Sequence, residues 1–317
     1  MRFDGKVVFV VNPRSAGGAT GRRLPELEAA AAQWLTDWRV VRTTRPGEAS
    51  ALAAEAATSG ADVVVAVGGD GTANEVVNGL FEGESVRRAA TSFALLPAGT
   101  GSDLVKTLRM PRDISESIRT LAQAAPRPVD VVALRLTSPA GHSVSRIGIN
   151  VTGFGANGEV VRRANLSSKR LGGRLTFLRA TVATLLTWEP TPTRIAWIDG
   201  NGQPGSWEGV LVSAFVANGA FCGGGMWIGR GGAIDDGLLD LVIVPSLGVA
   251  RTIAASPRLF SGTADRVNNV SRIAVRSLEA ETTDGRPMLV DVDGEQPGVL
   301  PLNARVLPKA LLVRALF

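Results

Sequence analysis

Apolar and polar residues follow two different rhythms along this chain of 317 residues. Up to about residue 128, short apolar runs alternate with segments whose apolar residues recur every three or four positions, the patterns of buried strands and of helices. The predicted strands are 6–12, 38–43, 61–68 and 93–97, and the predicted helices are 21–35, 47–60, 72–80, 102–108 and 113–124. This alternation predicts an α/β domain, a doubly wound parallel sheet with helices on both faces.

Beyond residue 128 the rhythm changes to short runs of alternating polarity separated by turn residues, which is typical of antiparallel strands. The predicted strands are 131–138, 142–150, 193–200, 207–219, 238–245 and 272–282, with helical segments at about 167–188 and 246–260. We therefore predict a first domain over 1–128 and a β-rich second domain over 129–298. The tail, 299–317, is expected to pack back on the first domain.

Composition narrows the classes of function. The net charge is +5 and the pI about 10.2, which suits an anionic partner, but aromatic residues are 5%, tyrosine is absent and no dense basic run occurs. Nucleic acid is therefore not an expected partner. Cys222 and His142 are the sole cysteine and histidine, so a disulfide, a cysteine metal cluster and a histidine-based triad are disfavoured. Acid–base chemistry must then rest on carboxylates.

Neither the N-terminal apolar run nor the long charge-free stretch 210–229 has the pattern of a membrane segment. The N-terminal run carries an acid at Asp4 and ends at Asn12-Pro13, as expected of a first strand and not of a signal peptide. The charge-free stretch 210–229 is interrupted by several glycines. We expect a soluble cytoplasmic protein that is at most peripheral to a membrane.

Glycine-bearing turns follow the predicted strands of the first domain. They read "NPRSAGG" from Asn12, "TTRPGE" from Thr43, "GGDGT" from Gly68 and "PAGTGSD" from Pro97. The carboxyl ends of parallel strands share one edge, where glycine lets backbone N–H groups approach a phosphate. Asp70 is suited to hold Mg²⁺ or an attacking hydroxyl. Taken alone, "GGDGT" is equally a tight turn with Asp70 as a cap.

In order and near spacing, "NPRSAGG", "GGDGTANEVVNGL", "LLPAGTGSD", "GGGMWIGRGGAIDDGLLDLVIV" and "VDVDGEQ" resemble the diacylglycerol kinase catalytic-domain family of bacterial lipid kinases, which includes sphingosine kinases. The resemblance spans nearly the whole chain. It implies an ATP-binding α/β domain, a C-terminal β-sandwich that takes the lipid, and a site in the cleft between them. The nucleotide contacts that it implies are Asn12, Pro13, Ser15, Gly17, Thr43, Gly69, Asp70, Gly71, Thr72, Asn74, Glu75 and Thr100.

The resemblance also implies acidic residues for Mg²⁺ and for proton transfer. For Mg²⁺ they are Asp70, Asp103 and Asp130. For the general base we expect Glu295 first and Asp293 second, although "DVDGE" alone also reads as a plain β-turn.

Two positions affect how closely the family pattern is followed. A second, structural Mg²⁺ would use Asp236 and the Leu238 carbonyl, but a further ligand position falls on Ala233, which has no side-chain oxygen, with Asp235 as an alternative. Ser102 stands where the family often has asparagine.

The predicted function is therefore ATP- and Mg²⁺-dependent phosphorylation of a lipid hydroxyl, with diacylglycerol as the default acceptor. Sphingoid bases, ceramides and glycerophospholipids stay open, as does a homodimer. The alternatives are an NAD kinase-like enzyme and a nucleotide-binding regulatory protein without transfer activity. Segments 167–188 and 246–260 mix arginine with large apolar residues, so each is either core or a surface for lipid head groups.

Overall fold

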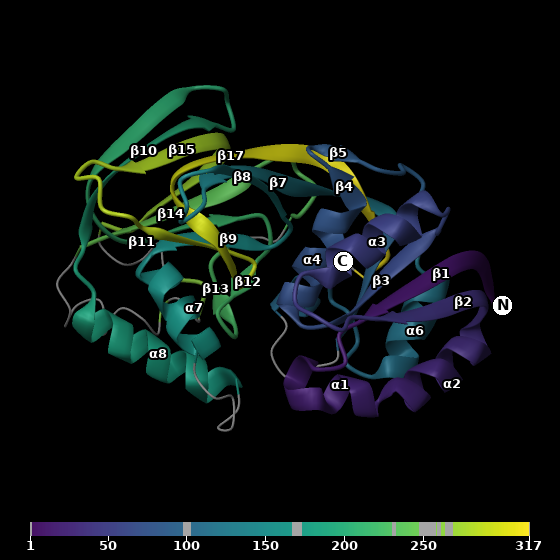
Figure 1. Cartoon of the computed structure of the whole chain (residues 1–317). Coiled ribbons are helices and arrows are strands. Elements are labelled where there is room, and N and C mark those ends of the chain that lie inside the picture. Colours follow the sequence, from purple (N-terminus) through teal and green to yellow (C-terminus); the bar gives the residue numbers. More distant parts are fainter. Residues whose placement is uncertain are drawn as a thin grey trace. The chain divides into compact units, whose positions relative to one another are not determined.

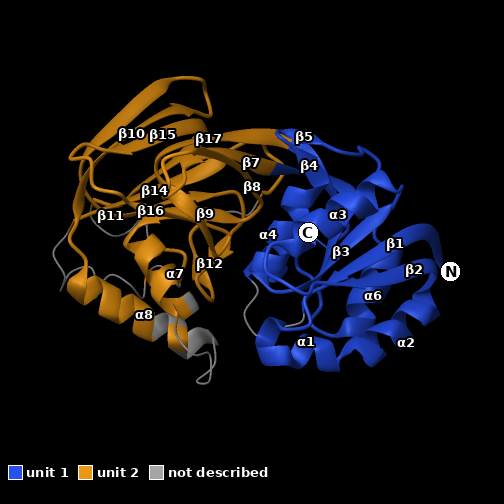
Figure 2. Ribbon diagram, in the orientation of Figure 1, with its two compact units in different colours: residues 1–130, 309–317 blue, residues 131–308 orange. Residues whose placement is uncertain are grey.

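The computed structural model describes residues 2–97, 103–166, 173–229, 233–246, 258, 261–263 and 269–316 (Figure 1). The chain forms two compact units, residues 1–130 with 309–317 and residues 131–308 (Figure 2). The part of the tail that joins the first unit therefore begins at Lys309, ten residues later than the sequence predicts, because 299–308 belongs to the second unit.

The first unit is built on a parallel sheet in the order β2-β1-β3-β6-β17. Its strands are β1 (Phe3–Val11), β2 (Leu35–Arg42), β3 (Val63–Gly68), β6 (Ser92–Pro97) and the end of β17 (Glu295–Val313). Every residue of β3 and β6 is buried. Such unbroken apolar runs are what a sheet covered on both faces requires.

Helices cover both faces of this sheet (Figure 1). They are the 3₁₀ turn η1 (Ser15–Gly18), α1 (Ala19–Arg22), α2 (Leu24–Trp34), α3 (Glu48–Thr58), α4 (Asp70–Leu80), α5 (Asp103–Thr107) and α6 (Ile114–Gln123), with a small hairpin of β4 (Phe81–Glu82) and β5 (Ser85–Val86). Helices α2 and α6 share a core with Phe9 and Val65, whereas α3 and α4 pack on the opposite face and on each other.

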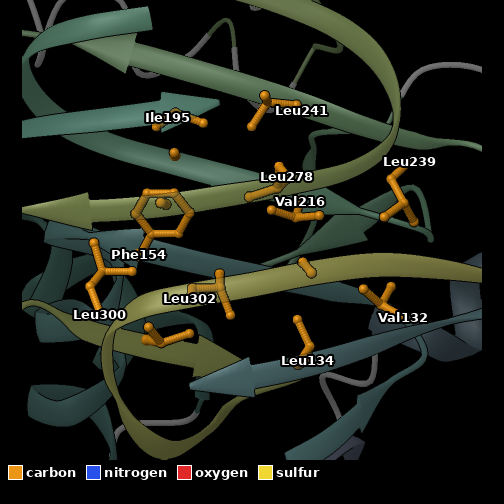
Figure 3. Packing of buried hydrophobic residues seen from close by; sticks show 14 of the residues in the cluster. Val132, Leu134, Phe154, Ile195, Val216, Leu239, Leu241, Leu278, Leu300 and Leu302 are labelled. Atoms are coloured by element: carbon orange, nitrogen blue, oxygen red, sulfur yellow. The ribbon is translucent and has the colours of Figure 1, made fainter. Parts of the chain in front are cut away.

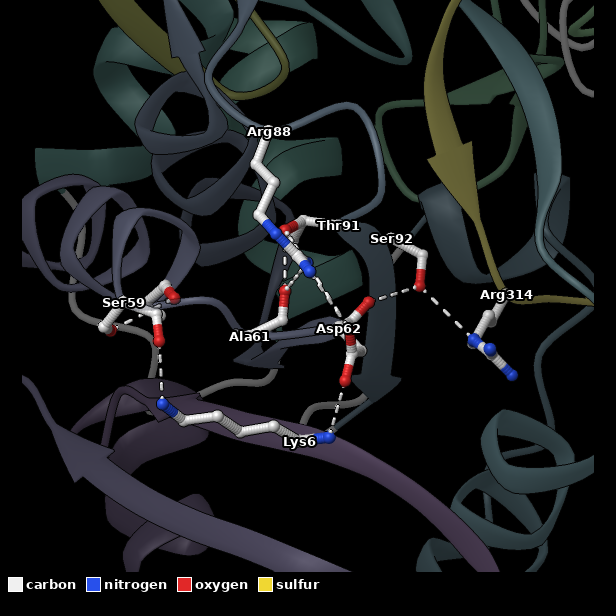
Figure 4. A network of polar contacts seen from close by, with 9 residues as sticks. Lys6, Ser59, Ala61, Asp62, Arg88, Thr91, Ser92 and Arg314 are labelled. Carbon is white, nitrogen blue, oxygen red and sulfur yellow. Dashed lines mark hydrogen bonds and ion pairs between the residues drawn. The ribbon is translucent and has the colours of Figure 1, made fainter.

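A polar network at the starts of these strands fastens the chain's end to the first unit (Figure 4). The Asp62 carboxylate accepts a hydrogen bond from Lys6 N at 2.9 Å and pairs with Arg88 at 3.4 Å. Arg314 donates to Ser92 Oγ at 3.3 Å and to the Ala124 carbonyl at 2.9 Å. Side chains far apart in the sequence thus hold the returning segment beside β6.

The second unit is a mostly antiparallel sheet in the order β10-β15-β14-β11-β9-β16-β17, with β7 pairing β17 and β8. Its strands are β7 (Arg127–Thr137), β8 (Ser143–Gly148), β9 (Val151–Gly155), β10 (Thr191–Asp199), β11 (Pro204–Ala217), β14 (Leu239–Pro245), β15 (Ser271–Thr282), β16 (Leu289–Val292) and β17, and β12 (Phe221–Cys222) pairs β13 (Met226–Trp227) separately. Phe154, Leu241, Leu278 and Leu302 lie within its core, all nearly inaccessible (Figure 3). The predicted change from parallel to antiparallel structure is confirmed.

Among the described residues of the second unit, helices α7 (Ala156–Leu166) and α8 (Gly173–Thr187) interrupt the strands. The predicted helix at 167–188 corresponds to α8, and its first six residues lie outside the described part. Nearly all of the predicted helix at 246–260 lies outside it too. Helix α7 was not predicted. No helix in the described ranges has the length and apolar content needed to cross a membrane.

Gly79 lets α3 and α4 approach closely. A Cβ built there would lie 2.1 Å from Ser50 O and 2.8 Å from Ala53 Cβ. We expect Gly79→Ala to destabilise the protein by about 1–3 kcal/mol, because overpacking outweighs the better helix propensity of alanine, which is worth about 1 kcal/mol. Denaturant unfolding measures this. The control is Gly69→Ala, where a Cβ meets no atom within 4 Å; equal losses in both variants would contradict the packing argument.

Candidate active site

Gly68 and Gly69, the two residues before Asp70, are glycines for different structural reasons. A Cβ on Gly68 would lie 2.5 Å from Thr72 Oγ1, so the end of β3 requires glycine to let α4 begin beside it. A Cβ on Gly69 would meet nothing within 4 Å. The first glycine therefore serves packing, and the second leaves the backbone at the start of α4 open to a ligand.

Asp70 caps a neighbouring helix. Its carboxylate accepts hydrogen bonds from Asp103 N at 3.1 Å and from Leu104 N at 3.3 Å, the first backbone N–H groups of α5. The buried Asp103 carboxylate accepts a hydrogen bond from Lys106 Nζ at 2.6 Å. The structure thus brings the predicted acidic pair together, through the backbone of Asp103.

Glu75, one turn further along α4, does the same for α3. Its two carboxylate oxygens accept hydrogen bonds from Gly47 N and Ala49 N, both at 3.1 Å. The resemblance implied a nucleotide contact here, but the described contacts of Glu75 hold the N-terminus of α3. A carboxylate at that place satisfies N–H groups that have no partner within the helix.

The loop after β1 turns through three successive left-handed residues, Ala16, Gly17 and Gly18, with φ of 51, 65 and 86°. Asn12 sets the turn, because its Oδ1 accepts a hydrogen bond from Arg14 N at 3.1 Å, while its Nδ2 lies 3.4 Å from Thr72 Oγ1. A Cβ on Gly17 would meet nothing within 4 Å. This loop therefore combines strained backbone with open space.

The other residues expected to contact the nucleotide lie either at the loop edge of the sheet or in the interior of the first unit. Register pairs Val11 with Arg42 and with Val67, so Asn12, Thr43 and Gly69 follow strand ends that lie side by side. The Pro13 carbonyl accepts a hydrogen bond from Gly21 N, and Ser15 Oγ hydrogen-bonds to Thr20 Oγ1. Asn74 is buried and bonded to Asn78, and Gly71 lies within the first turn of α4. Thr100 lies outside the described residues.

The other expected metal ligands are placed separately. Asp130 is fully buried and accepts a hydrogen bond from Lys309 N at 2.7 Å, where the chain returns to the first unit. Asp236 is exposed and its carboxylate accepts a hydrogen bond from Leu238 N at 3.0 Å, while Ala233 is exposed as well. Within the described ranges, no three residues among histidine, cysteine, aspartate and glutamate form a metal cage.

In the second unit, Asp293 and Glu295 have different environments. Asp293 is buried and left-handed, with φ of 52°, and its carboxylate accepts hydrogen bonds from Ile149 N, Asn150 N and Val151 N at 2.9–3.0 Å. Glu295 opens β17 with its side chain exposed. Asp293 thus holds its turn to the β8–β9 connection, and the residue Glu295 beside it is exposed.

Asp291 was not singled out by the sequence reasoning. It is 6% exposed, with Asn157 Nδ2 at 3.1 Å and Gly294 N at 2.9 Å from its carboxyl oxygens. Burial, together with the charges of Asp293 and Glu295, raises the pKa of Asp291 to about 8. The available sequence signal was the first aspartate of "DVDGE", a third acidic residue close to the two that the resemblance singled out. Asn150 and Asn218 were also missed; their side chains donate to the carbonyls of Phe221 and Ile149.

The α/β unit with glycine turns at one sheet edge and the antiparallel β unit each match the model of a known domain. Residues 6–134 match the model of the diacylglycerol kinase catalytic domain, and residues 150–315 match the YegS C-terminal NAD kinase beta sandwich-like domain. The chain therefore belongs to the diacylglycerol kinase catalytic-domain family of lipid kinases. The predicted fold class is confirmed, and membership implies lipid and ATP as substrates.

Relatives of known name agree with this assignment. A probable lipid kinase YegS-like protein of Stenotrophomonas maltophilia is 32% identical over 300 residues, which is 94% of this chain and 90% of the relative. The diacylglycerol kinase of Bacillus subtilis is 27% identical over 82% of this chain and 79% of its own. A solved Bacillus anthracis structure matches with a TM-score of 0.78 and 26% identity over 100% of this chain and 96% of its own.

The hydrogen bonds of Glu75 predict a measurable stability effect. Glu75→Ala removes both acceptors from the N-terminus of α3, so we expect a loss of about 1–2 kcal/mol, the scale of a lost helix cap, and faster hydrogen exchange at residues 47–49. Glu75→Gln keeps one acceptor and should lose less. Glu55→Ala, an exposed change on α3, is the control. A Glu75→Ala variant as stable as this control would contradict the capping role.

Proposed function

We propose that this protein transfers the γ-phosphoryl group of ATP to the hydroxyl of a lipid, with diacylglycerol as the acceptor to test first. The observation that carries the proposal is the turn between β16 and β17, in which Asp293 accepts hydrogen bonds from three backbone N–H groups and the next residue but one, Glu295, is exposed. General-base catalysis on an alcohol requires a carboxylate that the hydroxyl group can reach, and an exposed glutamate beside a fixed turn provides one.

ATP is proposed to bind the loop edge of the first unit. Gly17 and Gly69 leave backbone accessible, and Asn12, Thr43 and Thr72 follow neighbouring strand ends. Mg²⁺ commonly uses one or two carboxylates together with substrate phosphates, so the absence of a protein cage among the described residues is compatible with it. Asp70, with Asp103 beside it, is the proposed ligand, and the ion would neutralise phosphate charge when bound.

Glu295 is the proposed base, and Asp293 its anchor. The lipid hydroxyl gives its proton to Glu295 while its oxygen forms a bond to the γ-phosphorus, and the bond from that phosphorus to the ADP oxygen breaks, with the electron pair leaving on ADP. Asp293 is disfavoured as the base because its oxygens already accept three hydrogen bonds.

The experiment is a lipid panel with labelled ATP and purified protein, comparing diacylglycerol with sphingoid bases, ceramides and glycerophospholipids. Nicotinamide dinucleotide as acceptor tests the NAD kinase-like alternative. Phosphorylation of none of them, with ATP still bound, would favour a nucleotide-binding regulatory protein.

Glu295→Gln should lower kcat at least about a hundredfold, since general-base catalysis contributes roughly 10²–10⁴-fold, with ATP affinity little changed. The matched control is Glu208→Gln, an exposed glutamate paired with Arg194 on the sheet surface. Asp293→Asn should instead lower the melting temperature, because the amide removes charge from a carboxylate held by three donors. If Glu295→Gln keeps more than about a tenth of kcat, Glu295 is not the base.

Helices α7 and α8 are proposed as the surface that meets lipid. Leu166 and Leu186 are 75% and 63% exposed, and Arg162 and Arg179 are exposed on the same helices. This pattern, on a chain of net charge +5, favours peripheral contact with anionic lipid.

Flotation with vesicles tests this contact. We expect binding to anionic vesicles that weakens with salt, since exposed charges are screened within about 8 Å at physiological ionic strength. Leu166→Ser with Leu186→Ser should weaken it further, whereas changing the exposed Val210 to serine, on β11, should not. Equal binding to zwitterionic vesicles would contradict the charge component.

A further inference from the structure

Asp291 carries a buried carboxyl group that has no role in the proposed phosphoryl transfer. It lies in β16 opposite Gly153 of β9, two residues before Asp293 and four before Glu295. Only 6% of the residue is exposed. Burying a charged carboxyl group costs free energy. The burial of Asp291 so close to the turn of the proposed base therefore needs a structural explanation.

Its hydrogen bonds hold the turn that presents Glu295. One oxygen accepts from Gly294 N at 2.9 Å, the residue directly before Glu295. The other accepts from Asn157 Nδ2 at 3.1 Å, in the first turn of α7. Asp291 therefore links the backbone beside the proposed base to a helix.

A second contact fastens the same turn from its other side. Gln296 Nε2 donates a hydrogen bond to the Gly158 carbonyl, also in the first turn of α7. Gly158 fits against β16 so closely that a Cβ there would lie 2.4 Å from Leu289 O. Glu295 thus stands between two links to α7, one of which depends on the carboxyl group of Asp291.

The charge of Asp291 depends on its surroundings. Burial and the neighbouring Asp293 and Glu295 raise its pKa to about 8, against the opposing hydrogen bonds from Asn157 and Gly294. From β9, the facing residues 152–154 are uncharged, and from β17 the neighbour Gln296 is neutral.

The acidic group of helix α7 does not change its charge near neutral pH. Its ionisable group beside Asn157 is Glu159, whose pKa is lowered to about 2 by hydrogen bonds and charge from Arg162 and Arg163. Glu159 therefore stays ionised across the range in which Asp291 titrates.

We propose that Asp291 is a positioning residue whose carboxyl group links Gly294 N to Asn157 of α7 and so holds the Gly294-Glu295 turn in place for transfer. At neutral pH this carboxyl group carries a proton. This inference rests on the proposed function. The proton from the lipid hydroxyl goes to Glu295, and the proton on Asp291 stays where it is. When Asp291 ionises at alkaline pH, a further negative charge arises beside Asp293 and Glu295, and repulsion disturbs the turn.

The kinetic test is Asp291→Asn, because asparagine keeps an acceptor for Gly294 N and cannot ionise. In the wild type we expect kcat to fall about tenfold per pH unit above about pH 8. In Asp291→Asn the fall should move upward by at least about one pH unit. Asp284→Asn, an exposed carboxylate held by Arg286, is the control and should keep the wild-type profile. A fall at the same pH in Asp291→Asn overturns the proposal.

A stability test separates this inference from the proposed function, because it needs no lipid. An aspartate in the unfolded chain has a pKa of about 3.9 and the folded value is raised, so the stabilising effect of the proton is complete below about pH 4 and is lost as pH rises towards about 8. Asp291→Asn lacks this loss, so its melting temperature should fall less than that of the wild type between pH 5 and pH 9.

Parallel melting curves would overturn the proton assignment. If no lipid is phosphorylated, the proposed function fails while the melting curves still decide whether Asp291 carries the proton. Asp291→Ser, which is smaller and equally neutral, serves both measurements if the asparagine variant does not fold.

Discussion

The first unit depends on helix α4 presenting carboxylates to the N-termini of its neighbours. Asp70 accepts the first N–H groups of α5, and Glu75 accepts those at the start of α3. Such N–H groups have no partner within their own helix and carry its positive dipole end, so a carboxylate satisfies hydrogen bonding and charge together. The starts of α3 and α5 are thereby held to the helix that begins after β3.

In the second unit, too, a carboxylate accepts backbone N–H groups, here at a connection between two strands. The Asp293 carboxylate accepts three backbone N–H groups from residues 149–151, so a short turn is tied to a segment more than 140 residues earlier in the chain. The left-handed conformation of Asp293 is held in place by these bonds. In both units an acidic residue of a recognised motif organises backbone, and the neighbouring positions Gly69 and Glu295 are left accessible.

Periodicity predicted most of the fold because it reports burial directly. The short buried runs of β3 and β6, which are bounded by turn residues, and the alternating β15 have patterns typical of strands. Helix α7 was not predicted because "TGFGANGEVV" has three glycines before and within the first turn of the helix, and glycine locally disfavours a helix. The close fit of Gly158 on β16 is a tertiary effect. The return of the chain at Lys309 was not predicted for a similar reason, since β17 runs without a break from one unit to the other.

The candidate site was less predictable than the fold, because residue type does not determine a carboxylate's partners. Motif matching assigned Asp70 to Mg²⁺, Glu75 to the nucleotide, and Asp293 and Glu295 to proton transfer. The structure shows that the carboxylates of Asp70, Glu75 and Asp293 hold backbone N–H groups, and that Glu295 is exposed. Asp291 shows the limit most clearly. It lies at the end of β16, two residues before Asp293, but its carboxyl group accepts one backbone N–H and one side-chain amide, where that of Asp293 accepts three backbone N–H groups. Identical side chains two residues apart are thereby given different tasks, and the donors that the fold supplies to each carboxyl group decide which task it has.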